Sequence, residues 1–125
     1  MNDQVMIVDD DPSIRETVEI VLSAFGYSVS VAENGRVCLE KLKDEFKGLI
    51  LMDVMMPEMD GWNTIVEIKE RGLHGDNIIC MLTAVNDPGP KMEKLSEYII
   101  DYIRKPFTSE ELIEKVKEYL RYVKK

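Results

Sequence analysis

Three short runs of wholly apolar residues constrain the fold of this chain more than any other feature of its sequence. They are residues 5–8, 49–52 and 78–82, and each is too short for a helix of ordinary length. Such runs are typical of central strands in a parallel sheet, because those strands are buried on both faces. Longer segments with apolar residues at helical spacing separate the runs, so the sequence predicts alternating strands and helices.

Two further segments complete the predicted sheet. In residues 27–31, apolar side chains alternate with Ser28 and Ser30, which indicates a strand with one poorly buried face at a sheet edge. Residues 99–103 form the last predicted strand, interrupted by Asp101. An edge position for the second strand excludes a sequential order and suits the order 2-1-3-4-5. We therefore expect an α/β, flavodoxin-like, doubly wound five-stranded parallel sheet with helices on both faces.

Caps and apolar spacing predict the helices. Asp11 followed by Pro12 is typical of an N-cap and a first helical position, and Gly26 ends that helix. Residues 108–111 form a capping box, and residues 86–90 predict a loop before a short helix over about residues 91–98. The apolar positions at helical spacing are Ile14, Val18, Val21, Leu22 and Phe25, then Val37, Cys38, Leu42 and Phe46, then Trp62, Ile65 and Val66, and finally Leu112, Ile113, Val116, Tyr119 and Leu120.

Composition limits the class of protein. With 125 residues, 45% of them hydrophobic, the chain is long and apolar enough for one domain with a real core. A net charge of −8 argues against nucleic acid or an anionic membrane as the main partner. Cys38 and Cys80 lie within apolar patterns, so we expect buried thiols in a reducing cytoplasm. We find neither a signal peptide nor the ~20 consecutive apolar residues that span a membrane, so we expect a soluble, cytoplasmic protein.

Polar side chains stand directly after four of the predicted strands. Asp9 and Asp10 follow the first apolar run, Asp53 the second, Thr83 the third, and Lys105 the last strand. In an open parallel sheet, ligands bind beyond the carboxyl ends of the strands. The predicted fold therefore brings three carboxylates, one hydroxyl and one ammonium to a single edge.

This set of groups favours a hard divalent cation and phosphoryl chemistry. Three clustered carboxylates repel one another, so either some are protonated or a metal binds. Oxygen ligands without clustered His or Cys favour Mg²⁺ or Mn²⁺, which also neutralise phosphate oxygens. Asp53, at the centre of the sheet, is the expected nucleophile that forms an acyl phosphate. Lys105 and Thr83 are expected to contact the phosphoryl oxygens.

Simpler interpretations exist for each of these residues. Asp9 and Asp10 could be turn residues only, Thr83 an ordinary strand-end residue, and Lys105 a solvated lysine before a helix. Their joint placement at strand ends argues against these interpretations. For Asp11 the structural interpretation prevails, because this residue is placed to cap the first helix.

Four motifs make the chain resemble a response-regulator receiver domain, the family that includes CheY-like chemotaxis regulators. They are VDDDP (residues 8–12), LMDVMMPEMDG (51–61), MLTA (81–84) and DYIRKPF (101–107). Each motif is weak alone, but together, in this order and at the predicted strand ends, they are specific. The resemblance implies that residues 1–125 form a single receiver domain of two-component signalling.

The resemblance also implies roles for the acidic residues. Asp53 would accept a phosphoryl group from a histidine kinase or phosphotransfer protein. Asp10, Asp53 and the backbone carbonyl of Met55 would bind Mg²⁺ directly, and Asp9 would act through water. The domain would catalyse only its own phosphorylation and dephosphorylation, and would not be an enzyme in the usual sense.

A second implied set of residues transmits the signal. Thr83 and Lys105 would contact the phosphoryl group, and Tyr102 matches the switch aromatic of the family, although packing alone could also explain an aromatic there. The bond before Pro106 matches a peptide that is cis in the family. Phosphorylation would shift a conformational equilibrium and change affinity for a downstream protein or for a second copy of the chain.

Two alternatives from other classes remain open. A metal-dependent phosphohydrolase of the haloacid dehalogenase type would also use Asp53 as nucleophile, but needs a second acid where Met55 stands. A scaffold that is never phosphorylated would typically lack the aspartate, threonine or lysine, and all three are present.

The chain departs from the family pattern at two places. The loop with two prolines at residues 86–90 should delay or shorten the fourth helix, so partner surfaces carry over less well than site chemistry. Met55 and Val85 stand two residues after Asp53 and Thr83, where side chains tune phosphate lifetime in the family. Two apolar residues there predict slow dephosphorylation.

His74 is expected to be a solvated loop residue.

Overall fold

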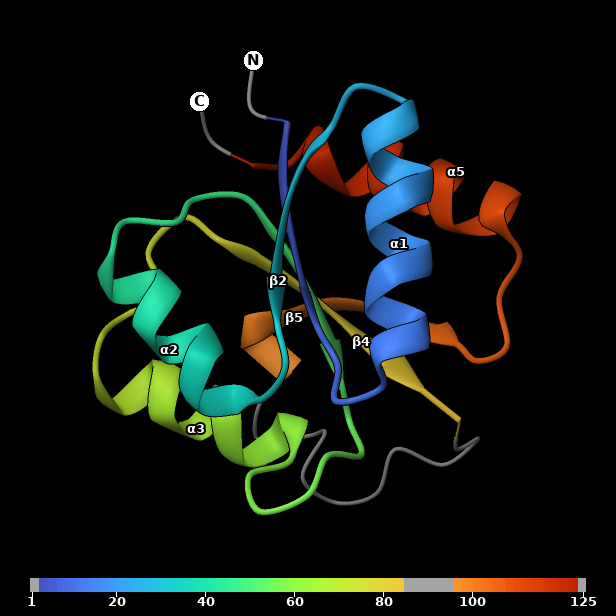
Figure 1. The fold of residues 1–125 in the computed structure, drawn as a ribbon. Helices are drawn as coiled ribbons and strands as arrows, with labels where there is room; N and C mark the ends of the chain where they lie inside the picture. Colours follow the sequence, from blue (N-terminus) through green and yellow to red (C-terminus); the bar gives the residue numbers. More distant parts are fainter. Residues whose placement is uncertain (1–2, 85–95, 124–125) are drawn as a thin grey trace.

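The computed structural model describes residues 3–84 and 96–123, and it forms a five-stranded parallel sheet between two layers of helices (Figure 1). The strand order is β2-β1-β3-β4-β5, which confirms the predicted order and the edge position of the second strand. The strands are β1 (Gln4–Val8), β2 (Ser28–Ala32), β3 (Leu49–Asp53), β4 (Ile78–Thr83) and β5 (Ile99–Arg104).

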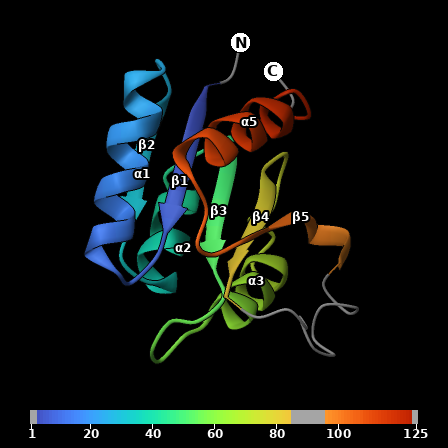
Figure 2. The same ribbon diagram turned by 90° about the vertical axis from the view of Figure 1, so that its right-hand side faces the viewer.

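Helices cover both faces of this sheet, as expected. Two of them, α1 (Pro12–Ala24) and α5 (Ser109–Leu120), lie on one face, while α2 (Gly35–Lys43) and α3 (Gly61–Glu70) lie on the other (Figure 2). A short 3-10 helix, η1 (Ser96–Tyr98), precedes β5. The predicted loop at residues 86–90, Val85 and most of the predicted fourth helix lie outside the described residues.

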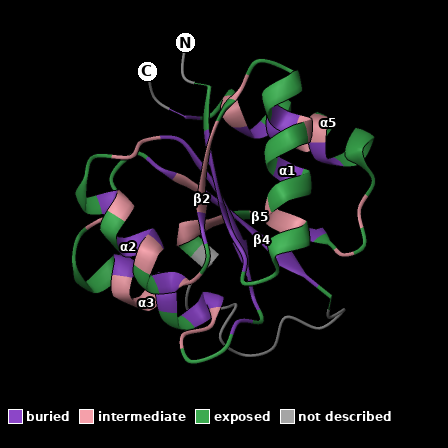
Figure 3. Cartoon of the chain, viewed as in Figure 1, coloured by how far each residue is buried: buried purple, intermediate pink, exposed green. Residues whose placement is uncertain are grey.

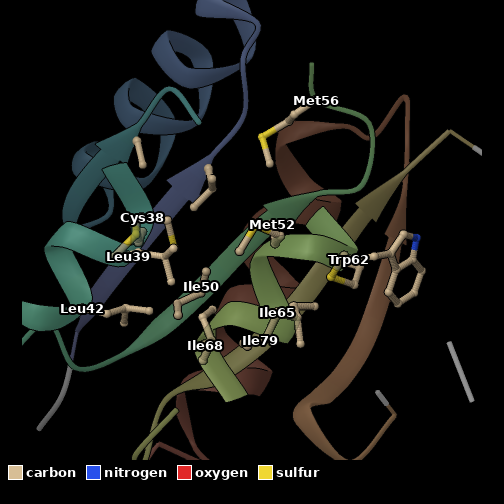
Figure 4. Packing of buried hydrophobic residues seen from close by; sticks show 14 of the residues in the cluster. Cys38, Leu39, Leu42, Ile50, Met52, Met56, Trp62, Ile65, Ile68 and Ile79 are labelled. Atoms are coloured by element: carbon tan, nitrogen blue, oxygen red, sulfur yellow. The ribbon is translucent and has the colours of Figure 1, made fainter. Parts of the chain in front are cut away.

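Alternate residues of the strands supply two separate hydrophobic clusters. Val5 and Ile7 of β1 pack towards α1 and α5, whereas Met6 and Val8 pack towards α2 and α3. The three apolar runs are buried except for Ile78, which is partly buried, so the central strands appear almost continuously purple in Figure 3. The α2/α3 cluster includes Trp62, which is 6% exposed and closes one end of it (Figure 4).

The predicted caps are confirmed. The Asp11 side chain accepts a hydrogen bond from the Ser13 amide at 2.9 Å, and Pro12 occupies the first position of α1. Thr108 and Glu111 form the reciprocal capping box of α5, with both hydrogen bonds at 3.1 Å. Cys38 and Cys80 are buried free thiols.

One expectation about an apolar residue was wrong, and two others were confirmed in part. Phe25 is 55% exposed, because it is the C-cap of α1 rather than part of its buried stripe, and its ring lies 5.7 Å from the Lys117 ammonium. Phe46 faces inward and packs against the α2/α3 side of the core, as expected, although it lies beyond the end of α2. His74 lies in a loop, as expected, but it is only partly exposed, since its ring makes an edge contact with Tyr98 at 5.2 Å between centroids.

Among the helices of the described segments, none combines the length and apolarity needed to cross a bilayer.

Candidate functional site

The carboxyl ends of the strands bring the predicted site residues to one edge of the sheet. Asp9 follows β1, Asp53 and Thr83 are the last residues of β3 and β4, and Lys105 follows β5. The arrowheads of β1 and β3 point to the same end of the molecule in Figure 2. Residues distant in sequence therefore become neighbours only in the folded chain, as the sequence predicted.

Asp9, Asp10 and Asp53 form a carboxylate cluster. Each offers one oxygen, and these oxygens all lie within 4.8 Å of one another. Asp9 is completely buried and Asp53 is 4% exposed, whereas Asp10 is exposed. At this separation and an effective dielectric near 20, each pair of ionised carboxylates repels by roughly 3 kcal/mol. The cluster therefore needs positive charge.

Lys105 supplies part of that charge. Its Nζ lies 2.9 Å from Asp9 Oδ2 and 3.2 Å from Asp53 Oδ1. Burial alone would lower the pKa of Lys105, but the hydrogen bonds and charges of Asp9 and Asp53 outweigh burial and raise this pKa above its ordinary value. One ammonium faces three carboxylates, so the cluster keeps a net negative charge.

Burial and a neighbouring negative charge both disfavour the ionised form of Asp53. Burial, followed by the neighbouring charge of Asp9, raises the pKa of Asp53 to about 6, and Lys105 offsets only part of this rise. A carboxyl group with this pKa is partly protonated just below neutral pH in the metal-free protein. An added cation would favour its ionised, nucleophilic form.

The donor set fits Mg²⁺ or Mn²⁺. Two buried carboxylates and one exposed carboxylate offer hard oxygen ligands, and no His or Cys belongs to this cluster of described residues. The exposed side of Asp10 leaves a route for a hydrated ion to enter. Met55 follows Asp53 closely, and its amide donates to Asp53 Oδ1 at 3.3 Å.

The other predicted residues surround the cluster. The Thr83 side chain is buried, and the Thr83 carbonyl accepts a hydrogen bond from the Lys105 amide at 2.8 Å, which ties the end of β4 to the loop after β5. The Lys105–Pro106 peptide is cis, as predicted. Met55 is 68% exposed, so its apolar side chain stands beside the site rather than in the core.

Tyr102 lies on β5, opposite Met81 of β4, and packs partly against the α2/α3 cluster. Within the described part of the chain, its hydroxyl is buried without a hydrogen-bond partner. A buried hydroxyl in this state costs about 1–3 kcal/mol relative to a paired one. A position in which the Tyr102 hydroxyl gained a hydrogen bond would therefore be favoured by this amount.

The sequence analysis missed Arg15. This α1 residue donates from Nη1 to the backbone carbonyl of Asp9 at 2.7 Å. A basic residue near the start of a helix interacts unfavourably with the helix dipole. This unfavourable placement is the sequence feature that could have indicated a specific role for Arg15.

An apolar cavity of about 420 Å³ opens beside Lys105. Ile14 and Val18 of α1 line one side of this cavity, and Pro106 and Phe107 line the other. The cavity therefore lies next to the charged cluster.

The comparisons with known proteins agree with this geometry. A family model described as the response regulator receiver domain matches residues 5–117. The probable transcriptional regulator ycf27 of Porphyridium aerugineum is 36% identical over 123 residues, which is 98% of this chain and 50% of that protein. The response regulator MprA of Mycolicibacterium vanbaalenii is 34% identical over 118 residues, covering 94% of this chain and 50% of that protein. The chain thus spans about half the length of these curated relatives.

Solved structures are similar over nearly the whole chain. A CheY-like response regulator receiver domain protein from Methanospirillum hungatei JF-1 has 47% identity and a TM-score of 0.91, and the match covers 96% of this chain and 95% of that chain. The chemotaxis protein CheY4 of Vibrio cholerae has 31% identity and a TM-score of 0.84, with coverage of 96% and 100%.

Proposed function

The chain belongs to the response regulator receiver domain family, and from this premise we propose that it is a Mg²⁺-dependent switch that accepts a phosphoryl group on Asp53. The observation that carries the proposal is the cluster of three carboxylates within 4.8 Å, with Lys105 bound to both Asp9 and Asp53. Few structural roles would justify so much uncompensated negative charge at one buried site.

In the proposed reaction, a carboxylate oxygen of Asp53 attacks the phosphorus of a phosphohistidine on a kinase or phosphotransfer protein. The new O–P bond forms as the P–N bond breaks. The electron pair of that bond stays with the histidine ring, which leaves as neutral imidazole because its other ring nitrogen carries a proton. The product is an acyl phosphate on Asp53. Bound Mg²⁺ would neutralise carboxylate and phosphoryl oxygens, and Asp9, Asp10, Asp53 and the carbonyl of Met55 are the groups that would hold it.

Lys105 and Thr83 would respond to the new charge. The Lys105 ammonium, which now contacts Asp53, would transfer this contact to a phosphoryl oxygen, and the Thr83 hydroxyl would donate to another. Movement of Thr83 would let Tyr102 change its position. Among the described residues no hydrogen bond fixes the buried Tyr102 hydroxyl, which supports this mobility. The output would be altered affinity for a downstream protein or for a second copy of the chain.

The biological setting is also a proposal. The curated relatives named above are a transcriptional regulator and a response regulator about twice as long as this chain. We propose that this domain works in the cytoplasm as the phosphorylation-controlled part of a signalling pathway, without itself contacting nucleic acid or membrane.

A small-molecule phosphodonor tests the proposal. The purified protein is incubated with acetyl phosphate and MgCl₂, and the acyl phosphate is measured by intact mass. We expect one label per chain, dependent on Mg²⁺ and absent in Asp53→Asn. Asp11→Asn is the matched control, because asparagine caps a helix as well as aspartate and Asp11 is not part of the cluster.

Each alternative function has its own outcome in this experiment. Rapid multiple turnover of the donor without accumulation of label would support a phosphohydrolase. Absence of any label in the wild-type protein would support a scaffold. Label that persists in Asp53→Asn would place the acceptor elsewhere and overturn the proposal.

A further inference from the structure

Arg15 contacts the site through the main chain and not through a carboxylate. Its guanidinium donates to the Asp9 carbonyl at 2.7 Å, across the turn that joins β1 to α1. Although three carboxylates are close by, no ion pair of Arg15 with Asp9, Asp10 or Asp53 occurs among the described residues. Arg15 therefore leaves the carboxylate oxygens available.

The position of Arg15 is unfavourable on electrostatic grounds alone. It lies near the beginning of α1, where the helix dipole disfavours a cation. Its charge also lies near a cluster that is proposed to bind Mg²⁺, so it should weaken cation binding through repulsion. A compensating benefit must come from the contact itself.

That contact completes the fixation of Asp9. The Asp9 amide donates to the Ala32 carbonyl at 3.1 Å, Oδ1 accepts from the Asp11 amide at 3.0 Å, and Oδ2 accepts from Lys105 at 2.9 Å. With Arg15 on the carbonyl, every polar group of this fully buried residue has a hydrogen-bond partner.

Mutual repulsion among the carboxylates tends to push the Asp9–Asp10 backbone away from Asp53. A hydrogen bond from α1 to the Asp9 carbonyl opposes this movement, because α1 is anchored in the core by Val18 and Leu22. The turn is thus kept in the geometry that clusters the three carboxylates before any cation arrives.

We propose that Arg15 is a positioning residue that preorganises Asp9 and Asp10 for a divalent cation. This inference rests on the proposed function insofar as Mg²⁺ is the cation. The positive charge of Arg15 should weaken Mg²⁺ binding, whereas its hydrogen bond to the Asp9 carbonyl should strengthen Mg²⁺ binding.

The opposite sign makes the test sharp. Arg15→Met removes the guanidinium but keeps a flexible apolar stem. Electrostatics alone predicts that this change tightens Mg²⁺ binding, whereas positioning predicts that the dissociation constant rises about tenfold, as expected for loss of a hydrogen bond to a charged donor. Mg²⁺ binding is measured by calorimetry and by the fluorescence of Trp62, the single tryptophan of the chain.

Arg36→Met is the matched control. Arg36 is an exposed residue in the first turn of α2, so its substitution changes the net charge equally without touching Asp9. We expect unchanged or slightly tighter Mg²⁺ binding for this variant, and partial recovery in Arg15→Lys, whose ammonium is also a donor. Binding in Arg15→Met as tight as in Arg36→Met would overturn the proposal.

A metal-free measurement separates this proposal from the proposed function. Hydrogen exchange at the Asp9 and Asp11 amides should be several-fold faster in Arg15→Met than in Arg36→Met, even without Mg²⁺. Equal exchange would overturn the role of Arg15 whatever the metal does. If exchange is faster in Arg15→Met but the wild-type protein binds no Mg²⁺, the result would support the positioning role of Arg15 and contradict the proposed function.

Discussion

At the scale of single residues, the three consecutive aspartates differ in environment. Asp9 is buried and bound by Lys105, Asp10 is exposed within the carboxylate cluster, and Asp11 caps α1. Sequence reasoning could separate Asp11 from the others because a following proline marks a helix start. It could not find the Arg15 contact, since that depends on how a long side chain folds back over a turn.

We propose that Met55 influences how water reaches the proposed acyl phosphate. Its exposed apolar side chain offers no polar group to an attacking water. We predict that Met55→Asn loses the phosphoryl group several-fold faster than the wild-type protein, whereas Met55→Leu, the matched apolar control, does not. The decay of the acyl phosphate after removal of the donor measures this rate. An unchanged rate in Met55→Asn would refute the prediction.

Asp101 is a second acidic residue with a distinct, structural role. Its carboxylate accepts hydrogen bonds from the Tyr119 hydroxyl and, at 2.7 Å, from the Tyr102 amide, and Lys115 lies 3.6 Å away. Burial would raise the pKa of Asp101, but these partners outweigh burial and lower the pKa below its ordinary value. These contacts join α5 to β5.

The lowered pKa sets the pH dependence of this contribution. A carboxyl group whose pKa is lower in the folded state stabilises the fold above the pKa of the unfolded chain, near 4, and the stabilisation is lost as pH falls through the folded value. We predict that Asp101→Asn lowers the free energy of unfolding by about 1 kcal/mol at pH 7, and by much less near pH 3. Urea unfolding at both pH values measures the difference.

Asp76→Asn provides the control for this prediction. Asp76 pairs with Lys47 at 3.6 Å, and the two side chains are 43% and 45% exposed, so solvent screens the pair and the expected loss is under about 0.5 kcal/mol. A pH-independent loss in Asp101→Asn would show that the carboxylate charge is not what matters.

At the scale of elements, the close approach of α2 and α3 depends on a glycine. A Cβ atom on Gly35 would lie 2.1 Å from Thr64 Oγ1, so the first turn of α2 sits directly against α3. Thr64 is itself buried, and its hydroxyl donates to the Asp60 carbonyl at 2.8 Å. The site loop between β3 and α3 ends at this Asp60 cap.

We predict that Gly35→Ala lowers the free energy of unfolding by about 1–2 kcal/mol, because overpacking outweighs the better helix propensity of alanine. Thr64→Ala removes the clashing hydroxyl, so the double variant should be more stable than the sum of the single changes allows. A double-mutant cycle by urea unfolding measures this coupling. Strictly additive effects would contradict the contact.

Elements were easier to predict from the sequence than the contacts between them. The helical spacing of apolar residues and the capping residues were sufficient to predict α1 and α5. The serines of β2 were sufficient to place this strand at an edge and so to predict the strand order. Phe25 was misplaced because helical spacing continues through the C-cap, where the backbone has already turned towards Gly26. The Asp101–Tyr119 contact could not be predicted, since it depends on how α5 lies across β5.

At the scale of the whole molecule, the carboxylate cluster links folding to ion binding. The clustered carboxylates exist only in the folded chain, so a cation bound there stabilises the folded state selectively. At ten times its dissociation constant, Mg²⁺ should raise the free energy of unfolding by about 1.4 kcal/mol and the melting temperature by about 5 °C.

Thermal unfolding with and without MgCl₂ tests this linkage, with NaCl of equal ionic strength as the control. EDTA should reverse the stabilisation, and Asp10→Asn should reduce it. An equal effect of NaCl would show that screening alone relieves the repulsion.

Because the site residues lie at the ends of four different strands, they are translated at different times. Synthesis proceeds from the N-terminus, so a growing chain contains Asp9 and Asp53 well before it contains Lys105. Until β5 and its following loop have been translated and have joined β4, the acidic groups lack their ammonium partner. If the proposed function holds, a nascent chain that does not yet include Lys105 would lack part of the site and should not accept a phosphoryl group on Asp53.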